Sequence, residues 1–161
     1  MGKSAKRLAL VYGLTTLTVL SLDLTTKSLA EFYLKERDVS LLPFLHLVLV
    51  YNKGMAFGLL AQAPDWVRLP LLLLTPVVAL FLTLFYALRS GSFLTAALMG
   101  MVGGGALGNL HDRALLGEVR DFVYLSYGGL SWPAFNLADA SISLAIALFL
   151  LKSSFEKAGK T

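Results

Sequence analysis

The chain has 161 residues, of which 57% are hydrophobic and 15% are charged, and its mean hydropathy is +0.71. Because a soluble domain normally carries about 25% charged residues, this composition indicates an integral membrane protein with a single domain over residues 1–161. The formal charge of +4 is scattered, which argues against nucleic acid as a partner and favours attraction to membrane lipid, and the absence of cysteine excludes disulfides and thiolate chemistry.

Four segments approach the ~20 apolar residues that are needed to cross ~30 Å of hydrocarbon. The first follows a basic stretch but continues into Asp23 and Lys27 without a clear cleavage site, so we expect a retained anchor helix rather than a cleaved signal peptide. The short link at 89–92 should make the second and third helices antiparallel neighbours. Residues 152–161 are expected to form a flexible, soluble tail. The four helices are expected at residues 8–29, 67–88, 93–110 and 134–151.

Residues 39–60, between the first two helices, have a different pattern. The stretch 41–51 is too short to span a bilayer, contains Pro43 near its start, and is rich in β-branched and aromatic residues. The Asn-Lys-Gly sequence at 52–54 predicts a turn, and a second short strand could follow at 55–58. We therefore predict an all-α membrane protein of four transmembrane helices with a small extracytoplasmic β element between helices one and two.

The number of basic residues does not by itself orient the chain, because each side of the membrane would hold seven of them. Three of the first seven residues are basic, however, and a dense basic end favours the cytoplasm. With both termini in the cytoplasm, nine of the ten acidic residues lie on the outer side. This topology gathers the polar groups of the membrane segments near the outer leaflet.

Asp139 lies near the start of the last apolar segment, where a carboxylate is costly and therefore suggests a functional site. Asp121, in the polar connection before that segment, is the nearest candidate partner. Two carboxylates that share a site cannot both ionise easily, and this property suits acid–base hydrolysis. Taken alone, Asp121 would be a solvated loop acid, but with Asp139 positioned to meet it a catalytic pair is predicted.

Other polar side chains gather at the same level, and each has a structural interpretation beside the functional one. Asp23 and Lys27, four residues apart on one helix face, could form an ion pair that closes the helix end. Asp112 and Arg113 could anchor the third helix at the headgroups or support the site. The side-chain amides in this group could form interhelical hydrogen bonds or could position a substrate. They belong to Asn52, Asn109 and Asn136.

Glycines at 100, 104 and 108 repeat at a spacing of four, which predicts close approach of another helix along a stripe of small residues. Residues 103–108 also match G-x-G-x-x-G, but no strand precedes them, so we do not expect a nucleotide site. The two histidines lack ligand spacing, and no metal site is expected.

Five segments that occur in order resemble the bacterial lipoprotein signal peptidase family (signal peptidase II), and together they extend over nearly the whole chain. The GGALGNLxDR and FNxAD segments are the most specific of them. The five are DLTTK at 23–27, YNKGMAFG at 51–58, GGALGNLHDR at 104–113, VRDF at 119–122 and FNLAD at 135–139.

The resemblance implies an aspartic endopeptidase of the bacterial cytoplasmic (inner) membrane, without metal or organic cofactor, that acts near the outer leaflet. Its substrates would be diacylglyceryl-modified precursor lipoproteins, cut just before the lipidated cysteine. The catalytic pair of the family matches Asp121 and Asp139. For the oligomeric state we expect a monomer, because it needs the fewest assumptions. Family residues around the site match Asp23, Lys27, Asn52, Gly105, Asn109, Asp112, Arg113, Asn136 and Ala138.

In the expected mechanism one aspartate is protonated and the other ionised, and the pair activates a water molecule that attacks the scissile carbonyl. Two other classes of function fit part of the sequence. A small transporter or channel subunit could use buried acids as a proton relay, although no internal repeat is visible. A membrane assembly factor could use the glycine stripe, but that interpretation leaves the acids on one side unexplained.

Overall fold

The structure is a computed structural model and describes residues 2–54, 60 and 62–158. In this part of the chain, four helices are each long and apolar enough to cross a membrane, and four short strands form one antiparallel sheet. The predicted fold class is therefore confirmed. The helices are α1 (Lys3–Leu34), α2 (Asp65–Arg89), α3 (Phe93–Leu116) and α4 (Leu137–Ala158). The strands are β1 (Val39–Leu42), β2 (Leu45–Asn52), β3 (Val119–Tyr127) and β4 (Leu130–Phe135).

Each helix continues beyond the predicted apolar stretch at one or both ends. α1 extends to Leu34 instead of residue 29, and α3 extends to Leu116 instead of residue 110. The tail expected from residue 152 onward is helical as far as Ala158. Hydropathy identifies only the lipid-soluble part of a helix, whereas the helix itself continues where polar side chains find partners or water.

The glycine stripe of α3 lies against α1, as the spacing predicts. A Cβ atom on Gly100 would lie 2.7 Å from the Tyr12 main-chain oxygen, and one on Gly104 would lie 2.7 Å from that of Thr16. The Thr16 hydroxyl donates a hydrogen bond of 3.1 Å to the Gly100 carbonyl. Because α3 also packs on α2 and α4, it forms the centre of the bundle.

The segment expected to be one strand at 41–51 is instead a hairpin. Pro43 and Phe44 form its turn, and β1 and β2 pair on either side of it. Proline fixes its own φ angle and has no N–H to donate, so this position suits a turn better than a strand. The turn predicted at 52–54 is supported by a hydrogen bond of 2.9 Å from the Gly54 N–H to Asn52 Oδ1. The second short strand predicted at 55–58 lies outside the described residues.

Half of the sheet comes from the connection between α3 and α4, which the sequence analysis treats as a loop. There β3 and β4 form a second hairpin around Gly128 and Gly129, whose φ angles are +58° and +84°. Both values lie in the left-handed region that glycine adopts without steric cost. Since β2 pairs with β3, the two hairpins join into one sheet in the order β1-β2-β3-β4.

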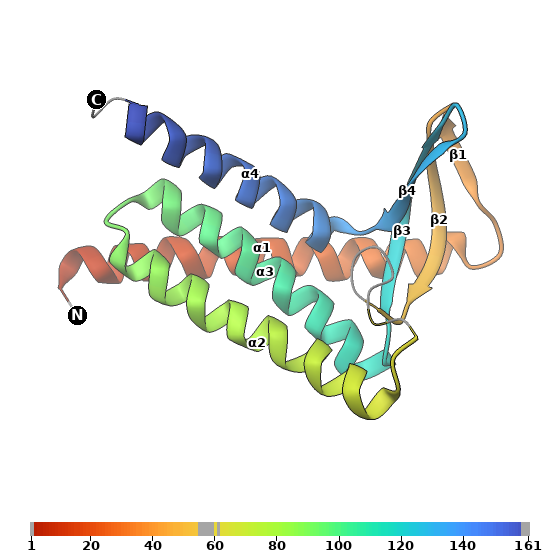
Figure 1. Cartoon of the computed structure of the whole chain (residues 1–161), viewed down its shortest axis with the longest axis horizontal. Coiled ribbons are helices and arrows are strands. Elements are labelled where there is room, and N and C mark those ends of the chain that lie inside the picture. The colour runs from red at the N-terminus through yellow and green to blue at the C-terminus, as the bar shows by residue number, and fades with distance from the viewer. Residues whose placement is uncertain (1, 55–59, 61, 159–161) are drawn as a thin grey trace.

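The sheet lies at the end of the bundle opposite to both chain termini (Figure 1). α1 and α3 point toward it with their C-terminal ends, and α2 and α4 begin there. Gly117, with a φ of +76°, ends α3 and lets the chain turn directly into β3. The polar ends of the membrane segments therefore meet at the base of one sheet.

Replacing Gly104 by alanine is expected to destabilise the bundle, because the new Cβ would collide with the main chain of α1. Overpacking of this kind costs about 1–3 kcal/mol, which corresponds to a Tm lower by roughly 3–10 °C. Thermal unfolding in detergent measures the effect. Gly13→Ala is the matched control, because no atom lies within 4 Å of a Cβ built there. Equal Tm values for the two variants would contradict the close approach of α1 and α3.

Candidate active site

Asp121 is the third residue of β3, and its side chain is almost completely buried. Its Oδ2 accepts a hydrogen bond of 3.0 Å from Asn52 Nδ2, and its Oδ1 accepts one of 2.7 Å from Asn136 Nδ2. The pairing of β2 with β3 brings Asn52 to this place, with Val50 opposite Asp121. The acid expected in a polar connection is thus held in a sheet by two amide donors.

Asp139 lies in the first turn of α4, where the helix dipole favours a negative charge. Its Oδ1 accepts a hydrogen bond of 2.8 Å from Asn109 Nδ2. Its main-chain N–H donates to Asn136 Oδ1 at 3.0 Å, and its Oδ2 lies 3.4 Å from the Asn136 main-chain nitrogen. This reciprocal arrangement is a helix cap, in which each side chain satisfies a free main-chain donor of the other residue.

Asn136 donates to both carboxylates, from its side-chain amide to Asp121 and from its main-chain N–H to Asp139, and both acids line one cavity of about 470 Å³. One part of the cavity wall is polar and the rest is apolar. The polar part consists of Asn52, Asn109, Arg113, Asp121, Asp139 and Ser143, and the larger apolar side chains are Val119, Leu125, Trp132, Phe135 and Ile142. A cavity that combines a large apolar wall with a few convergent polar groups has the typical character of a ligand site.

Burial raises the pKa of Asp121 from its ordinary value of 3.8 to about 6. The negative charge of Asp139 acts in the same direction, while the hydrogen bonds from Asn52 and Asn136 oppose the shift. Desolvation dominates because it disfavours the charged form of a carboxyl group. A carboxyl group with this pKa can hold or release a proton near neutral pH, as acid–base catalysis requires.

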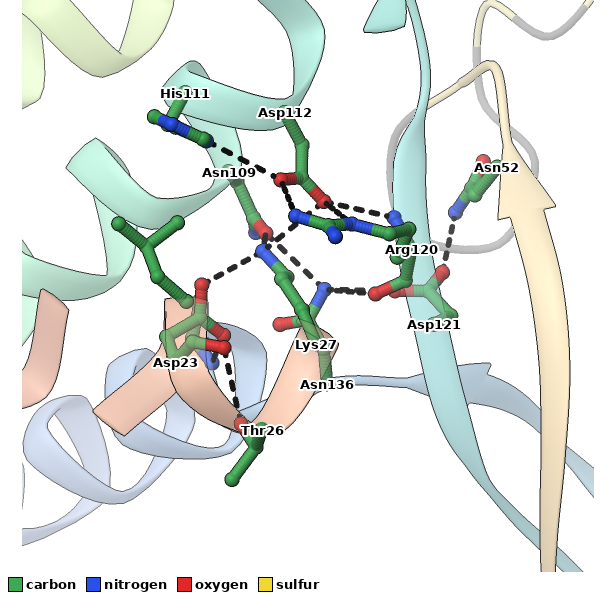
Figure 2. A network of polar contacts seen from close by, with 12 residues as sticks. Asp23, Thr26, Lys27, Asn52, Asn109, His111, Asp112, Arg120, Asp121 and Asn136 are labelled. Atoms are coloured by element: carbon green, nitrogen blue, oxygen red, sulfur yellow. Dashed lines mark hydrogen bonds and ion pairs between the residues drawn. The ribbon is translucent and has the colours of Figure 1, made fainter. Parts of the chain in front are cut away.

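A fully buried ion pair lies behind the cavity (Figure 2). Lys27 Nζ lies 2.7 Å from Asp23 Oδ2 and donates a hydrogen bond of 2.9 Å to Asn109 Oδ1. Asp23 Oδ1 in turn accepts a hydrogen bond of 2.8 Å from the Ala138 N–H at the start of α4. The pair is therefore an ion pair within α1, and it also fixes the amide that donates to Asp139.

Asp112 and Arg113, although adjacent, point to different surroundings. Asp112 is fully buried, so it does not anchor α3 at the lipid headgroups. Its partner is Arg120, whose Nη2 lies 2.7 Å from Asp112 Oδ1. Arg113 lines the cavity, and its Nη2 donates a hydrogen bond of 3.0 Å to the Gly54 carbonyl.

Gly105 and Ala138 bring α3 and α4 together directly beside the two acids. A Cβ atom on Gly105 would lie 2.7 Å from the Ala138 main-chain oxygen, and the side chain of Ala138 is fully buried. Larger side chains at these positions would separate Asn109 on α3 from Asp139 on α4. All eleven residues singled out from the sequence thus lie at the same end of the bundle, either lining the cavity or immediately behind it.

The structure adds two residues that the sequence analysis does not single out, Arg120 and Glu31. Arg120 is buried and bonds to Asp112, and its Nη1 lies 2.8 Å from Glu31 Oε2. A signal was present in the sequence, since a basic residue directly precedes Asp121 and the other residues of 119–125 are apolar or aromatic. Glu31 gives no such signal, because an acid near a helix end is commonplace.

Within the described part of the chain, no three His, Asp or Glu side chains are grouped so that they could hold a metal ion. His46 connects three strands, with its Nδ1 at 2.9 Å from Ser40 Oγ and its Nε2 at 3.1 Å from Ser126 Oγ. His111 Nδ1 lies 3.5 Å from Asp112 Oδ1. Both histidines therefore have structural partners.

The fold is that of a known class of membrane enzyme. A solved structure described as a bacterial membrane enzyme, determined by the in meso method at 2.3 Å resolution, superposes with a TM-score of 0.81. The match covers 92% of this chain and 90% of the other, at 24% sequence identity. This likeness shows the fold, and the sequence comparisons show the family.

The chain belongs to the signal peptidase (SPase) II family, a family of aspartic peptidases, whose sequence profile matches residues 15–155. The lipoprotein signal peptidase of Aquifex aeolicus (strain VF5) is 55% identical over 152 residues, which are 94% of this chain and 90% of that protein. The lipoprotein signal peptidase of Sulfurihydrogenibium sp. (strain YO3AOP1) is 46% identical over 136 residues, which are 82% of this chain and 83% of that protein.

The raised pKa of Asp121 predicts a pH-dependent effect of Asp121→Asn on stability. The pKa of Asp121 is about 6 in the folded protein, against an ordinary value of 3.8 that applies to the unfolded chain. Ionisation of Asp121 therefore opposes folding, and the wild-type protein loses stability as the pH rises from the lower of these values through the higher one. An asparagine side chain cannot ionise, so the stability of the variant relative to wild type should increase from pH 4 to pH 8, by up to about 3 kcal/mol in unfolding free energy. Thermal unfolding in detergent across this pH range measures it. A difference that stays constant from pH 4 to pH 8 would contradict the assigned pKa.

Proposed function

We propose that this chain is an intramembrane aspartic endopeptidase that removes the signal peptide from diacylglyceryl-modified prolipoproteins and cuts before the lipidated cysteine. Asp121 and Asp139 form its catalytic dyad. One observation carries this proposal, namely that the two carboxylates line one cavity and both accept hydrogen bonds from Asn136, Asp121 from its side-chain amide and Asp139 from its main-chain N–H. Membership of the signal peptidase II family supports the same substrate class.

In the proposed cycle Asp121 carries the proton of the dyad when the substrate is attacked, because it is the more deeply buried of the two acids and its raised pKa brings the neutral form within reach near neutral pH. Asp139 is the ionised partner and accepts a proton from a water molecule bound between the two acids. The oxygen of that water attacks the scissile carbonyl carbon, while Asp121 donates its proton to the carbonyl oxygen. Asp139 then transfers the proton it took to the leaving amine as the peptide bond breaks, while Asp121 takes back a proton from one hydroxyl of the tetrahedral intermediate, which becomes the new carboxyl group and restores the dyad.

The cavity wall supports a model for substrate placement. β4 is the last strand of the sheet and borders the cavity through residues 132–135, so an extended peptide in the cavity would lie alongside this strand. Arg113 and Asn52 lie beside the acids and can donate hydrogen bonds to peptide carbonyls. The acyl chains of the substrate remain in lipid, so the bilayer contributes to affinity without a further protein pocket.

The proposed topology places both termini in the cytoplasm and the sheet at the outer leaflet of the bacterial inner membrane. The termini lie together at one end of the bundle and the sheet lies at the other (Figure 1). The basic N-terminal residues suit the cytoplasmic side, and nine of the ten acids then lie on the outer side. In this proposal the protein acts as a monomer, without metal or cofactor, and its partners are precursor lipoproteins and membrane lipid rather than nucleic acid.

Asp121→Asn and Asp139→Asn are each expected to abolish cleavage of a lipidated precursor in detergent, because an amide can neither donate nor accept the required proton. The loss should exceed about 10³-fold, while protein yield and helicity persist. Release of the signal peptide, followed on a gel or by mass spectrometry, measures the activity.

Asp38→Asn is the matched control, because this exposed acid lies at the same end of the molecule but outside the cavity. It should retain the activity of the unmodified chain. Turnover at the normal rate by either dyad variant would exclude the proposed mechanism.

A further inference from the structure

We propose that Arg120 is a positioning residue for the reaction, because its guanidinium, clamped between Asp112 and Glu31, holds the first residues of β3 and thereby the carboxyl group of Asp121 in place. This inference rests on the proposed dyad, since it assigns to Arg120 the task of placing one of its two acids. It adds a functional residue that neither touches the substrate nor lines the cavity.

Arg120 contacts Asp112 through three separate donors. Its main-chain N–H and its Nε each lie 3.1 Å from Asp112 Oδ2, and its Nη2 lies 2.7 Å from Asp112 Oδ1. The two side-chain contacts form the planar fork in which a guanidinium binds a carboxylate most specifically. Because Asp112 is fully buried on the central helix α3, this contact fixes both the main chain and the side chain of Arg120.

The remaining guanidinium nitrogen extends the clamp to α1 and β2. Arg120 Nη1 donates a hydrogen bond of 2.8 Å to Glu31 Oε2, and the other oxygen of Glu31 accepts one of 3.0 Å from the Tyr51 hydroxyl. One arginine therefore connects α1, α3 and β3 directly, and β2 through Glu31. These connections restrict translation of β3 along the bundle and rotation about its own axis.

Arg120 and Asp121 are adjacent in a strand, so their side chains point to opposite faces. The side chain of Arg120 faces the helices, whereas that of Asp121 faces the cavity, as Figure 2 shows for Arg120 beside Asp112 and Asp121 beside Asn52. The carbonyl of Arg120 lies 3.4 Å from Asn136 Nδ2, the same amide that donates to Asp121 at 2.7 Å. A shift of Arg120 would therefore move Asp121 relative to Asn136 and to Asp139.

A purely structural role for Arg120 makes a different prediction. Asp23 and Asp112 are both buried near Lys27, at 2.7 and 3.7 Å, so two buried acids need a second cation. If Arg120 supplied only that charge, its loss would lower stability but would leave the turnover of the folded molecules unchanged. The positioning role predicts instead a loss of kcat at nearly constant KM, because the catalytic acid is misplaced while the substrate site is intact.

The test compares Arg120→Met, Arg120→Lys and Glu31→Gln in the full chain in detergent, with kcat and KM for a lipidated precursor scaled to the folded fraction. A displacement of about 1 Å costs on the order of 100-fold in rate, so Arg120→Met should lower kcat by about that factor, with KM changed less than twofold. Lysine keeps the charge but not the fork, and should restore kcat to within about tenfold. Glu31→Gln removes a half-exposed partner and should cost roughly threefold.

A double-mutant cycle identifies the clamp. Adding Glu31→Gln to Arg120→Met should cause no further loss, because Glu31 then has no guanidinium to hold. Arg37→Met, at an exposed position near the same end of the molecule, is the control and should keep normal kcat. If Arg120→Met does not fold, the kcat values of Glu31→Gln and Arg120→Lys test the positioning role instead. Both variants keep a cation beside Asp112 and are therefore expected to fold.

Normal kcat in the folded fraction of the Arg120 variants, a rise in KM alone, or additive effects of Arg120→Met and Glu31→Gln would overturn the inference. Asp121→Asn is measured in parallel. If that variant is inactive while the Arg120 variants have normal kcat, only the clamp is wrong. If Asp121→Asn is active, the dyad itself is wrong, and the two failures are thereby distinguished.

Discussion

The side-chain amide of Asn136 is the contact on which the arrangement of the site depends. It donates to Asp121 on β3, approaches Asn109 on α3 at 3.1 Å, and through its Oδ1 caps the helix that carries Asp139. Three separate elements, β3, α3 and α4, therefore meet at one fully buried side chain. A buried amide is held firmly only when its donors and its acceptor are all used. Both the Nδ2 and the Oδ1 of Asn136 have hydrogen-bonding partners. The distance between the two acids is therefore set by covalent geometry and a few short hydrogen bonds.

The small residues of α3 make this polar centre possible. Charges at the end of a membrane helix are costly unless they are paired with one another. A Cβ atom on Gly108 would collide with the carboxylate of Asp23, and one on Gly105 would lie 2.7 Å from the Ala138 carbonyl. The glycine stripe is thus more than a surface for helix packing, because at its outer end it provides the space in which Asp23 and Lys27 fit between α1, α3 and α4.

The helices and the acids were predictable because their signals are local. A run of about 20 apolar residues indicates a transmembrane helix wherever it occurs, and an acid within such a run stands out without any knowledge of its neighbours. The second hairpin was equally visible in principle, since Gly128-Gly129 separates two runs of apolar and aromatic residues. The same connection also contains three charged residues, Glu118, Arg120 and Asp121, and these indicate a polar loop. The hairpin is recognised only when the glycine pair is given more weight than the charges.

The ion pairs of Arg120 could not be predicted in the same way. Glu31 and Arg120 are 89 residues apart, and nothing in the neighbourhood of either residue indicates the other. They meet only because the two hairpins join into one sheet, which places the start of β3 beside the last turn of α1. Long-range pairing of this kind follows from topology, so a sequence pattern can identify the acids of the site but not the cation that orders them.

Three acids of the site are buried and Asp139 is partly buried, and their partners separate the two acids that stabilise the structure from the two assigned to the proposed dyad. Asp23 and Asp112 each contact a cation directly, at 2.7 Å to Lys27 and 2.7 Å to Arg120. Among the described residues, Asp121 and Asp139 receive hydrogen bonds from amides and form no ion pair, although both line the cavity. A directly bound cation supplies a carboxylate with a counter-charge, whereas neutral donors orient a carboxylate without supplying one. The proposed dyad needs two acids that are oriented without a direct ion pair, and the amide donors on Asp121 and Asp139 fit that role.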